Sequence, residues 1–162
     1  MGFSDVSFRL ATEVVVGCTA RGLTLATAES CTGGLIGACL TEIPGSSAVL
    51  DRGFIVYSNR AKQEVLGVPT PILKVHGAVS AETAAAMAKG ARERASVDLA
   101  IAVTGIAGPG GGSEAKPVGL VHLALASKKG IEAGHEIFPG DRHAVRDATL
   151  ERALRMILEA CT

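Results

Sequence analysis

The sequence has few aromatic residues: Phe and Tyr together make up 3% of its 162 residues, and tryptophan does not occur. Because 48% of the chain is nevertheless hydrophobic, its core has to be built from Val, Leu, Ile and Ala. A chain of this length can bury a core of its own. We find no repeat, linker or low-complexity tract, so we expect one domain over residues 1–162.

The sequence also lacks an excess of either charge, since 16 basic residues balance 16 acidic ones. Without a net field or a basic run, we expect no nucleic-acid partner and no membrane partner. No apolar run approaches the ~20 residues of a membrane-spanning helix. The first residues do not have the pattern of a signal peptide. A cytoplasmic location is the expectation.

Metal-binding and disulfide patterns are missing as well. The four cysteines show no CxxC spacing, and no two of the four histidines have the spacing of a helical zinc motif. We therefore expect neither a metal nor a cofactor. His122 and His135 fall in two predicted strands and are interpreted as bystanders.

Helical and strand patterns alternate along the chain. Apolar residues at helical spacing predict helices over 5–21, 35–43, 61–66, 81–95 and 141–160, with Ser80 as an N-cap. Short apolar runs predict strands over 23–26, 53–58 and 99–104, followed by a hairpin over 119–126 and 131–138. This order predicts an α/β fold: a three-layer α/β/α sandwich with a mixed, mostly parallel sheet of about five strands.

The segment TAESCTGG, residues 27–34, joins a predicted strand to a predicted helix. Ser30 or Thr32 could cap the helix, which is a common role for these residue types. Ser30 could instead be a nucleophile, with the unpaired helix amides stabilising an oxyanion. Cys31 is a second possible nucleophile, but no histidine lies nearby in sequence to ionise it. Spacing alone favours the cap.

The segment YSNRAK, residues 57–62, contains the only tyrosine of the chain. Lys62 could act as a base for a hydroxyl nucleophile if its pKa were lowered. The alternative is a tyrosine at a strand end and a solvated lysine. A short-chain dehydrogenase would place Tyr and Lys four residues apart and after its glycine-rich loop, so both spacing and order exclude that class.

The glycine-rich segment TGIAGPGGG, residues 104–112, could let a ligand approach the backbone closely. It matches neither dinucleotide nor triphosphate motifs, and a flexible surface loop is the alternative. Arg142, in the segment GDR, could bind a phosphate through both of its terminal nitrogens, or be an ordinary first-turn charge.

Five segments in this order resemble the CinA C-terminal-domain family. They are RGLTLATAESCTGGLIGACLTEIPGSS, GFIVYSNRAKQEVLGV, HGAVSAETAAAMAKGAR, AVTGIAGPGGGSEAKPVGLVHLAL and FPGDRHAVRDATLERAL. Together they cover most of residues 21–154. Characterised members of this family are nicotinamide-nucleotide amidohydrolases. The resemblance therefore implies hydrolysis of nicotinamide mononucleotide to nicotinate mononucleotide and ammonia, and it reverses the preference for a cap at Ser30.

The resemblance also implies roles for individual residues. Ser30 would be the nucleophile, Lys62 its base and Tyr57 an aid to proton transfer. The implied substrate-binding residues are Thr32, Gly33, Gly34, Ser47, Thr104, Gly105, Ala107, Gly108 and Arg142. We expect amides near Gly33 and Gly34, or the glycine-rich loop, to bind the phosphate, with Arg142 contributing.

The resemblance further implies a homo-oligomer, a dimer or larger. Larger proteins of this type carry an additional N-terminal domain associated with pyrophosphatase activity, which we do not expect here. One alternative function is a nucleotide-binding regulatory module of the competence-associated type that turns over slowly or not at all. Charge and aromatic content give no support to a structural role in DNA uptake.

Overall fold

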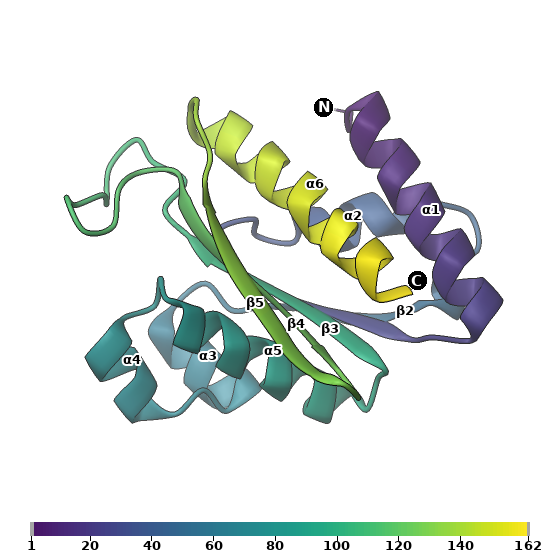
Figure 1. Ribbon diagram of the computed structural model, residues 1–162, viewed down its shortest axis with the longest axis horizontal. Helices are drawn as coiled ribbons and strands as arrows, with labels where there is room; N and C mark the ends of the chain where they lie inside the picture. The colour runs from purple at the N-terminus through teal and green to yellow at the C-terminus, as the bar shows by residue number, and fades with distance from the viewer. Residues whose placement is uncertain (1, 162) are drawn as a thin grey trace.

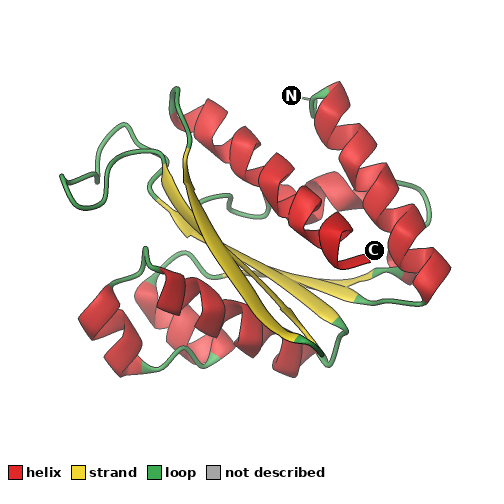
Figure 2. Cartoon of the chain, in the orientation of Figure 1, coloured by secondary structure: helices red, strands yellow, loops and turns green. Residues whose placement is uncertain are grey.

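The computed structural model describes residues 2–161. A five-stranded sheet lies between two layers of helices (Figures 1 and 2), with the strand order β2-β1-β3-β4-β5. One layer contains α1 (Asp5–Arg21), α2 (Leu35–Thr41) and α6 (Arg142–Cys161), and the other contains α3 (Asn59–Leu66), α4 (Thr70–His76) and α5 (Ala81–Ala95). The strands are β1 (Leu25–Glu29), β2 (Leu50–Ile55), β3 (Leu99–Gly105), β4 (Leu120–Ser127) and β5 (Gly130–Ile137).

The sheet is mixed. Strand β1 pairs in parallel with both β2 and β3, whereas β3–β4 and β4–β5 are antiparallel pairs. Strand β5 therefore runs in the same direction as the three parallel strands, and only β4 runs against them. The predicted three-layer α/β/α sandwich with a mixed, mostly parallel sheet of five strands is confirmed.

The core is aliphatic on both faces of the sheet, as the composition predicts. The face covered by α1, α2 and α6 buries mainly Leu, Ile and Val. The face covered by α3, α4 and α5 buries mainly Ala, together with Met87. Ser80 caps α5 as predicted, because its side chain accepts a hydrogen bond from the amide of Thr83.

The sequence patterns misplaced two strands and missed one helix. Strand β2 begins and ends three residues earlier than the predicted 53–58, because the chain leaves the sheet after Ile55 and turns toward α3. Strand β1 begins and ends later than the predicted 23–26, because its polar residues Thr27 and Glu29 are buried in the strand rather than exposed after it. Helix α4 was not predicted, although Pro71 in its first turn and Gly77 at its end are usual helix boundary residues. A short 3₁₀ helix, Ser46–Ala48, precedes β2.

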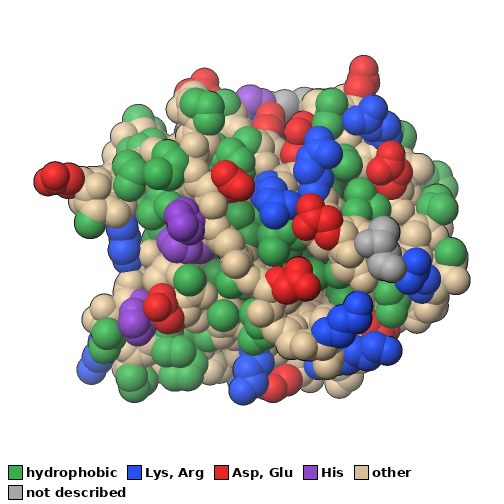
Figure 3. All heavy atoms as spheres, in the orientation of Figure 1, with side chains coloured by type: hydrophobic (Ala, Val, Ile, Leu, Met, Phe, Trp, Pro, Cys, Tyr) green, Lys and Arg blue, Asp and Glu red, His purple; other side chains and the backbone are tan. Residues whose placement is uncertain are grey.

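The surface shows no large region of one charge on the face drawn in Figure 3, where basic and acidic side chains are interspersed. Among residues 2–161, no helix is both long enough and apolar enough to cross a membrane. Most of the residues with predicted catalytic or binding roles lie at one end of the parallel strands.

Candidate active site

Three segments meet where the parallel strands end. The turn from Ser30 follows β1, Tyr57 comes two residues after β2, and the glycine-rich loop follows β3. Because β1, β2 and β3 are parallel, their carboxyl ends lie at the same edge of the sheet. Ligands of α/β proteins bind at this edge.

Ser30 and Lys62 come together at this edge. The Nζ atom of Lys62 lies 3.0 Å from Oγ of Ser30, although the two residues are 32 positions apart. Lys62 is on the second turn of α3, which begins after Ser58; the Ser58 side chain accepts from the amide of Ala61. Both side chains are buried: Lys62 is 1% exposed and Ser30 is 8% exposed.

The surroundings of Lys62 favour a neutral amine. Burial lowers the pKa of Lys62 from its ordinary value of 10.5, because the ammonium form loses hydration. Its Nζ also lies 3.0 Å from the carbonyl oxygen of Val56 and 3.2 Å from that of Tyr57. A neutral amine has two N–H bonds for these two carbonyls and one lone pair that can accept the hydroxyl proton of Ser30.

Ser30 is not the cap of the following helix. Helix α2 begins after Gly34 without a side-chain cap at that position. The carboxylate of Glu29 performs this role instead: Oε2 accepts from the amides of Gly34 and Ile36, and Oε1 accepts from the amide of Gly37. Glu29 is 1% exposed, and the helix amides stabilise its buried charge. Glu29 was not predicted from the sequence, because a side chain that reaches five to eight residues ahead has no simple spacing signature.

Thr32 belongs to the same network and is not a helix cap. Its hydroxyl donates to Oε2 of Glu29 at 2.7 Å, and its carbonyl oxygen accepts from Nη2 of Arg146 at 2.9 Å. Within residues 2–161, neither the amide of Cys31 nor that of Thr32 donates a hydrogen bond to another residue. These two amides are the available donors beside Ser30.

Cys31 is a poor nucleophile in this position. The side chain is 5% exposed, and burial raises the pKa of its thiol to about 11. The thiolate, which is the reactive form, is therefore scarce near neutral pH. This supports the choice of Ser30 over Cys31.

The phenol of Tyr57 points to another part of the site. Its hydroxyl oxygen accepts from Nη2 of Arg142 at 3.0 Å, and Nη1 of Arg142 donates to the carbonyl oxygen of Gly108 at 2.9 Å. Tyr57 touches Lys62 through its backbone carbonyl rather than its phenol. A part for the phenol in proton transfer stays a prediction.

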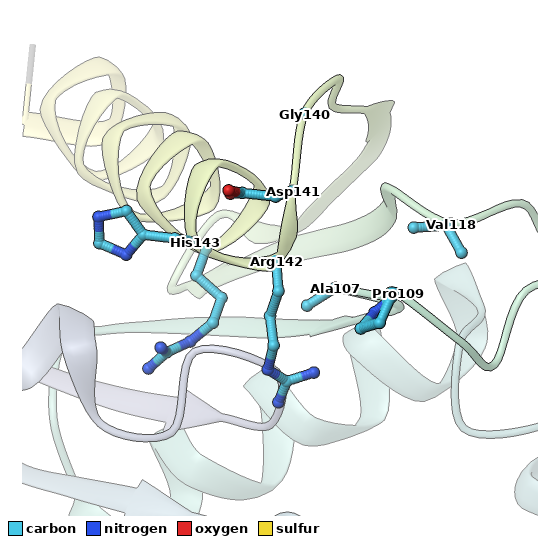
Figure 4. A pocket seen from close by; sticks show the side chains of 8 residues that line it. Ala107, Pro109, Val118, Gly140, Asp141, Arg142 and His143 are labelled. Carbon is cyan, nitrogen blue, oxygen red and sulfur yellow. The ribbon is translucent and has the colours of Figure 1, made fainter.

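A cavity of about 620 Å³ opens beside this contact. Its lining comes from the glycine-rich loop and the start of α6: Ala107, Pro109, Val118, Gly140, Asp141, Arg142, His143 and Arg146. Figure 4 shows the Arg142 side chain reaching from α6 toward Ala107 and Pro109. The volume lies within the range of small-molecule binding sites. Ala107 and Arg142, both predicted to bind substrate, line it.

The other predicted loop residues have structural roles. The Thr104 hydroxyl donates to the carbonyl oxygen of Ala78 at 2.8 Å and is buried. A side chain at Gly105 would collide with Val121 and the carbonyl of Leu120, and Gly108 has a positive φ of 82°. These features shape the loop that lines the cavity.

The amides of Gly33 and Gly34 already have partners in the protein. The amide of Gly33 donates to the carbonyl of Ser30, and that of Gly34 donates to Glu29. The expected phosphate contact with these amides therefore has no free donor at either position, and the arginine-lined cavity is the better candidate for an anion.

Ser47 is not brought to the site within this chain. It is exposed in the 3₁₀ helix that precedes β2, whereas Ser30 follows β1. Because Leu25 pairs with Leu50 in parallel strands, the two serines lie at opposite ends of the sheet. Five strand residues at ~3.3 Å each separate these ends by roughly 17 Å.

The histidines do not gather around a metal. Across residues 2–161, no group of three or more His, Cys, Asp or Glu side chains is arranged to bind one. His122 and His135 lie side by side with ring centroids 5.3 Å apart. Burial and the neighbouring His135 lower the pKa of His122.

Comparison with known proteins gives consistent matches. Residues 7–161 match the family model described as the CinA C-terminal domain. A putative competence-damage inducible protein of Caldicellulosiruptor bescii is 53% identical over 153 residues, covering 94% of this chain and 37% of the relative. A CinA-like protein of Geobacter sulfurreducens is 56% identical over 134 residues, with 83% and 32% covered. The chain thus spans about a third of the length of these curated relatives.

Solved structures match over almost the whole chain. The crystal structure of the competence/damage inducible protein CihA from Agrobacterium tumefaciens has a TM-score of 0.96 and 49% identity, covering 98% of both chains. A CinA superfamily protein from Escherichia coli has a TM-score of 0.92 and 33% identity, covering 99% of this chain and 94% of that one. The five segments, the family model and these structures agree, and this chain belongs to the CinA C-terminal domain family.

Proposed function

We propose that this chain is a serine amidohydrolase that converts nicotinamide mononucleotide to nicotinate mononucleotide and ammonia. The observation that carries the proposal is the buried amine of Lys62, 3.0 Å from the hydroxyl of Ser30. Burying a lysine is unfavourable, and lysines with lowered pKa values are typical of catalytic bases. The resemblance to nicotinamide-nucleotide amidohydrolases supplies the substrate.

The first half of the reaction forms an acyl-enzyme. Oγ of Ser30 attacks the carboxamide carbon while its proton passes to Nζ of Lys62. The carbonyl oxygen becomes negatively charged, and the amides of Cys31 and Thr32 are the donors available to stabilise it. Lys62 then returns the proton to the departing nitrogen, so that the C–N bond breaks and ammonia leaves.

The second half restores the enzyme. Water attacks the ester carbon and gives its proton to Lys62, the bond to Oγ of Ser30 breaks, and Ser30 recovers its proton. The product is the pyridine carboxylate. In each half Lys62 is first a base and then an acid, which requires an amine that is neutral at the start. The two backbone carbonyls that Nζ contacts orient the amine and do not require it to be protonated.

The test is release of ammonia from nicotinamide mononucleotide by the purified protein, with a metal chelator present. We expect turnover by the wild type, loss of at least about a thousandfold in Ser30→Ala, and near-normal turnover in the neighbouring control Cys31→Ala. Turnover by Ser30→Ala would contradict the mechanism. Tight nucleotide binding by a wild type without turnover would instead favour the regulatory-module alternative.

A further inference from the structure

The cavity beside the site contains two positive charges without carboxylate partners. Arg142 and Arg146 both line it, and a spacing of four residues puts them on one face of α6, where like charges repel. Neither forms an ion pair within residues 2–161. The nearby acids have other partners: Asp147 lies 3.1 Å from His143, and Asp141 accepts from the amide of Ala144 at 2.9 Å. Even with the Asp141 carboxylate, which also lines the cavity, the two guanidinium groups leave a net positive charge there, and this points to an anionic ligand.

Arg146 also contacts the turn that follows Ser30. Its Nη2 atom donates to the carbonyl oxygen of Thr32 at 2.9 Å. The hydroxyl of the same Thr32 is bound by Glu29, so the residue is fixed from two sides. Arg146 is half-buried, and a guanidinium has five N–H donors, so several remain for a ligand after this contact. One side chain thus spans the distance from the cavity to the turn.

We propose that Arg146 is the second arginine of a phosphate-binding site in this cavity, and that it positions the turn whose amides face the developing oxyanion. The inference rests on the function proposed above. To that function it adds Arg146 and a coupling between phosphate binding and the alignment of the turn's amides. Arg142 contributes from the same face while it also contacts Tyr57 and Gly108.

The coupling follows from geometry. Two planar guanidinium groups can bind the oxygens of one phosphate, each through a pair of parallel N–H bonds. A bound phosphate neutralises their repulsion and holds the Arg146 side chain in place. The same side chain fixes the carbonyl of Thr32, and the amides of the turn stay aligned. Binding of the remote phosphate then contributes to kcat as well as to affinity.

The experiment compares wild type, Arg146→Ala and Arg146→Lys in steady-state kinetics. The substrates are nicotinamide mononucleotide and its nucleoside without the phosphate. Arg152→Ala is the matched control, because Arg152 is on the same helix and its partner Glu159 lies 3.1 Å away, outside the cavity. Melting temperatures verify that each variant is folded.

With the nucleotide, we expect Arg146→Ala to raise KM and to lower kcat, each by about tenfold or more, as for loss of a hydrogen bond to a charged group. With the nucleoside, kcat falls and KM is unchanged. Arg146→Lys keeps the charge but not the planar group. Its KM should therefore return closer to the wild-type value than its kcat does. Unchanged nucleotide kinetics in Arg146→Ala, or equal losses in Arg152→Ala, would overturn the phosphate site. A raised KM with normal kcat on both substrates would overturn the positioning of the turn.

A binding measurement separates this inference from the proposed function. Inorganic phosphate is titrated with the wild type and with Arg146→Ala, and its phosphorus NMR line width is followed. Broadening in the wild type that Arg146→Ala abolishes supports the site even if nicotinamide mononucleotide is not hydrolysed. Equal broadening in both proteins would contradict it, whatever the turnover.

Discussion

The two faces of the sheet are packed with side chains of different size, although the same strands supply both. Along β3 and β4, Leu, Ile and Val point toward α1 and α6, while the alanines at alternate positions, Ala100, Ala102, Ala124 and Ala126, face α5. The larger side chains fill the space under two long helices. The small ones let α5 lie close to the sheet, and α3 packs on α5 in turn.

This difference matters because the nucleophile and its base come from different layers. Ser30 is in the turn between β1 and α2, whereas Lys62 is on α3, across the sheet edge. Helices α3 and α5 approach each other closely at Gly90 of α5: a Cβ atom there would lie 2.0 Å from the carbonyl oxygen of Leu66, the last residue of α3. The packing of small side chains between α3, α5 and the sheet therefore sets the distance between Lys62 and Ser30, whereas the larger aliphatic side chains on the other face contribute mainly to stability.

Among substitutions in the packing of the two faces, the largest effect on turnover is expected for Gly90→Ala. In an ordinary helix this change is stabilising, but here the new methyl group has to push α3 away from α5. Overpacking of this kind costs about 1–3 kcal/mol of unfolding free energy. A displacement of ~1 Å at the reacting groups costs about a hundredfold in turnover. Steady-state kinetics with nicotinamide mononucleotide measure the loss of turnover, and chemical denaturation measures the loss of unfolding free energy.

The control for Gly90→Ala is Leu154→Ala on the opposite face. Leu154 is fully buried, and its truncation leaves a cavity that costs about 2–5 kcal/mol. We expect its kcat, corrected for the folded fraction, to be close to that of the wild type. If Leu154→Ala lost turnover as strongly as Gly90→Ala, the division of labour between the two faces would be wrong.

The turnover rate is expected to depend on pH through Lys62. Because burial lowers the pKa of Lys62 below 10.5, kcat/KM rises with pH through that lowered pKa as the amine becomes neutral. Between the lowered pKa and 10.5 the unfolded chain binds more protons than the folded one at this residue. Its contribution to stability therefore increases with pH in that window.

Denaturation across this pH range, compared with Lys62→Met, isolates the contribution of Lys62. The stability difference between the two proteins should change in favour of the wild type as pH rises. Lys62→Arg, which keeps its proton at every accessible pH, should be inactive throughout. A kcat/KM that does not depend on pH, or an active Lys62→Arg, would exclude Lys62 as the base.

Most elements of the fold could be predicted from the sequence because their patterns are local. Alternation of Leu and Ala in β3 and β4, and the cap at Ser80, are features of neighbouring residues. The contact between Ser30 and Lys62 could not be derived in this way, since it joins two layers through the approach of α3. Only the resemblance to a family brought these two residues together before the structure did.

Glu29 and Arg146 were missed for related reasons. A carboxylate in a buried strand is unfavourable alone, and its stabilisation by the amides of α2 depends on where that helix begins. Arg146 looks like an ordinary helix charge until the structure shows Thr32 within reach. Ser47 is the opposite case: it was predicted to line the pocket, but it lies at the other end of the sheet.

The smallest effect is expected at Thr27, a buried polar residue on the face with large side chains. It is 1% exposed, and its hydroxyl has no hydrogen-bond partner within residues 2–161. Thr27→Val replaces this hydroxyl with a methyl group of similar volume, so the cost of an unsatisfied buried group is removed. We expect the unfolding free energy to rise by about 1 kcal/mol.

The matched variant is Thr83→Val on the alanine face, where the hydroxyl donates to the carbonyl oxygen of Gly77 at 2.7 Å. Removing this bond should lower stability by about 1 kcal/mol, so that the two substitutions have opposite signs. If both variants were destabilised equally, the hydroxyl of Thr27 would have a partner in solution. The groove between α2 and β2, which Thr27 helps to line, is where an ordered water would supply it.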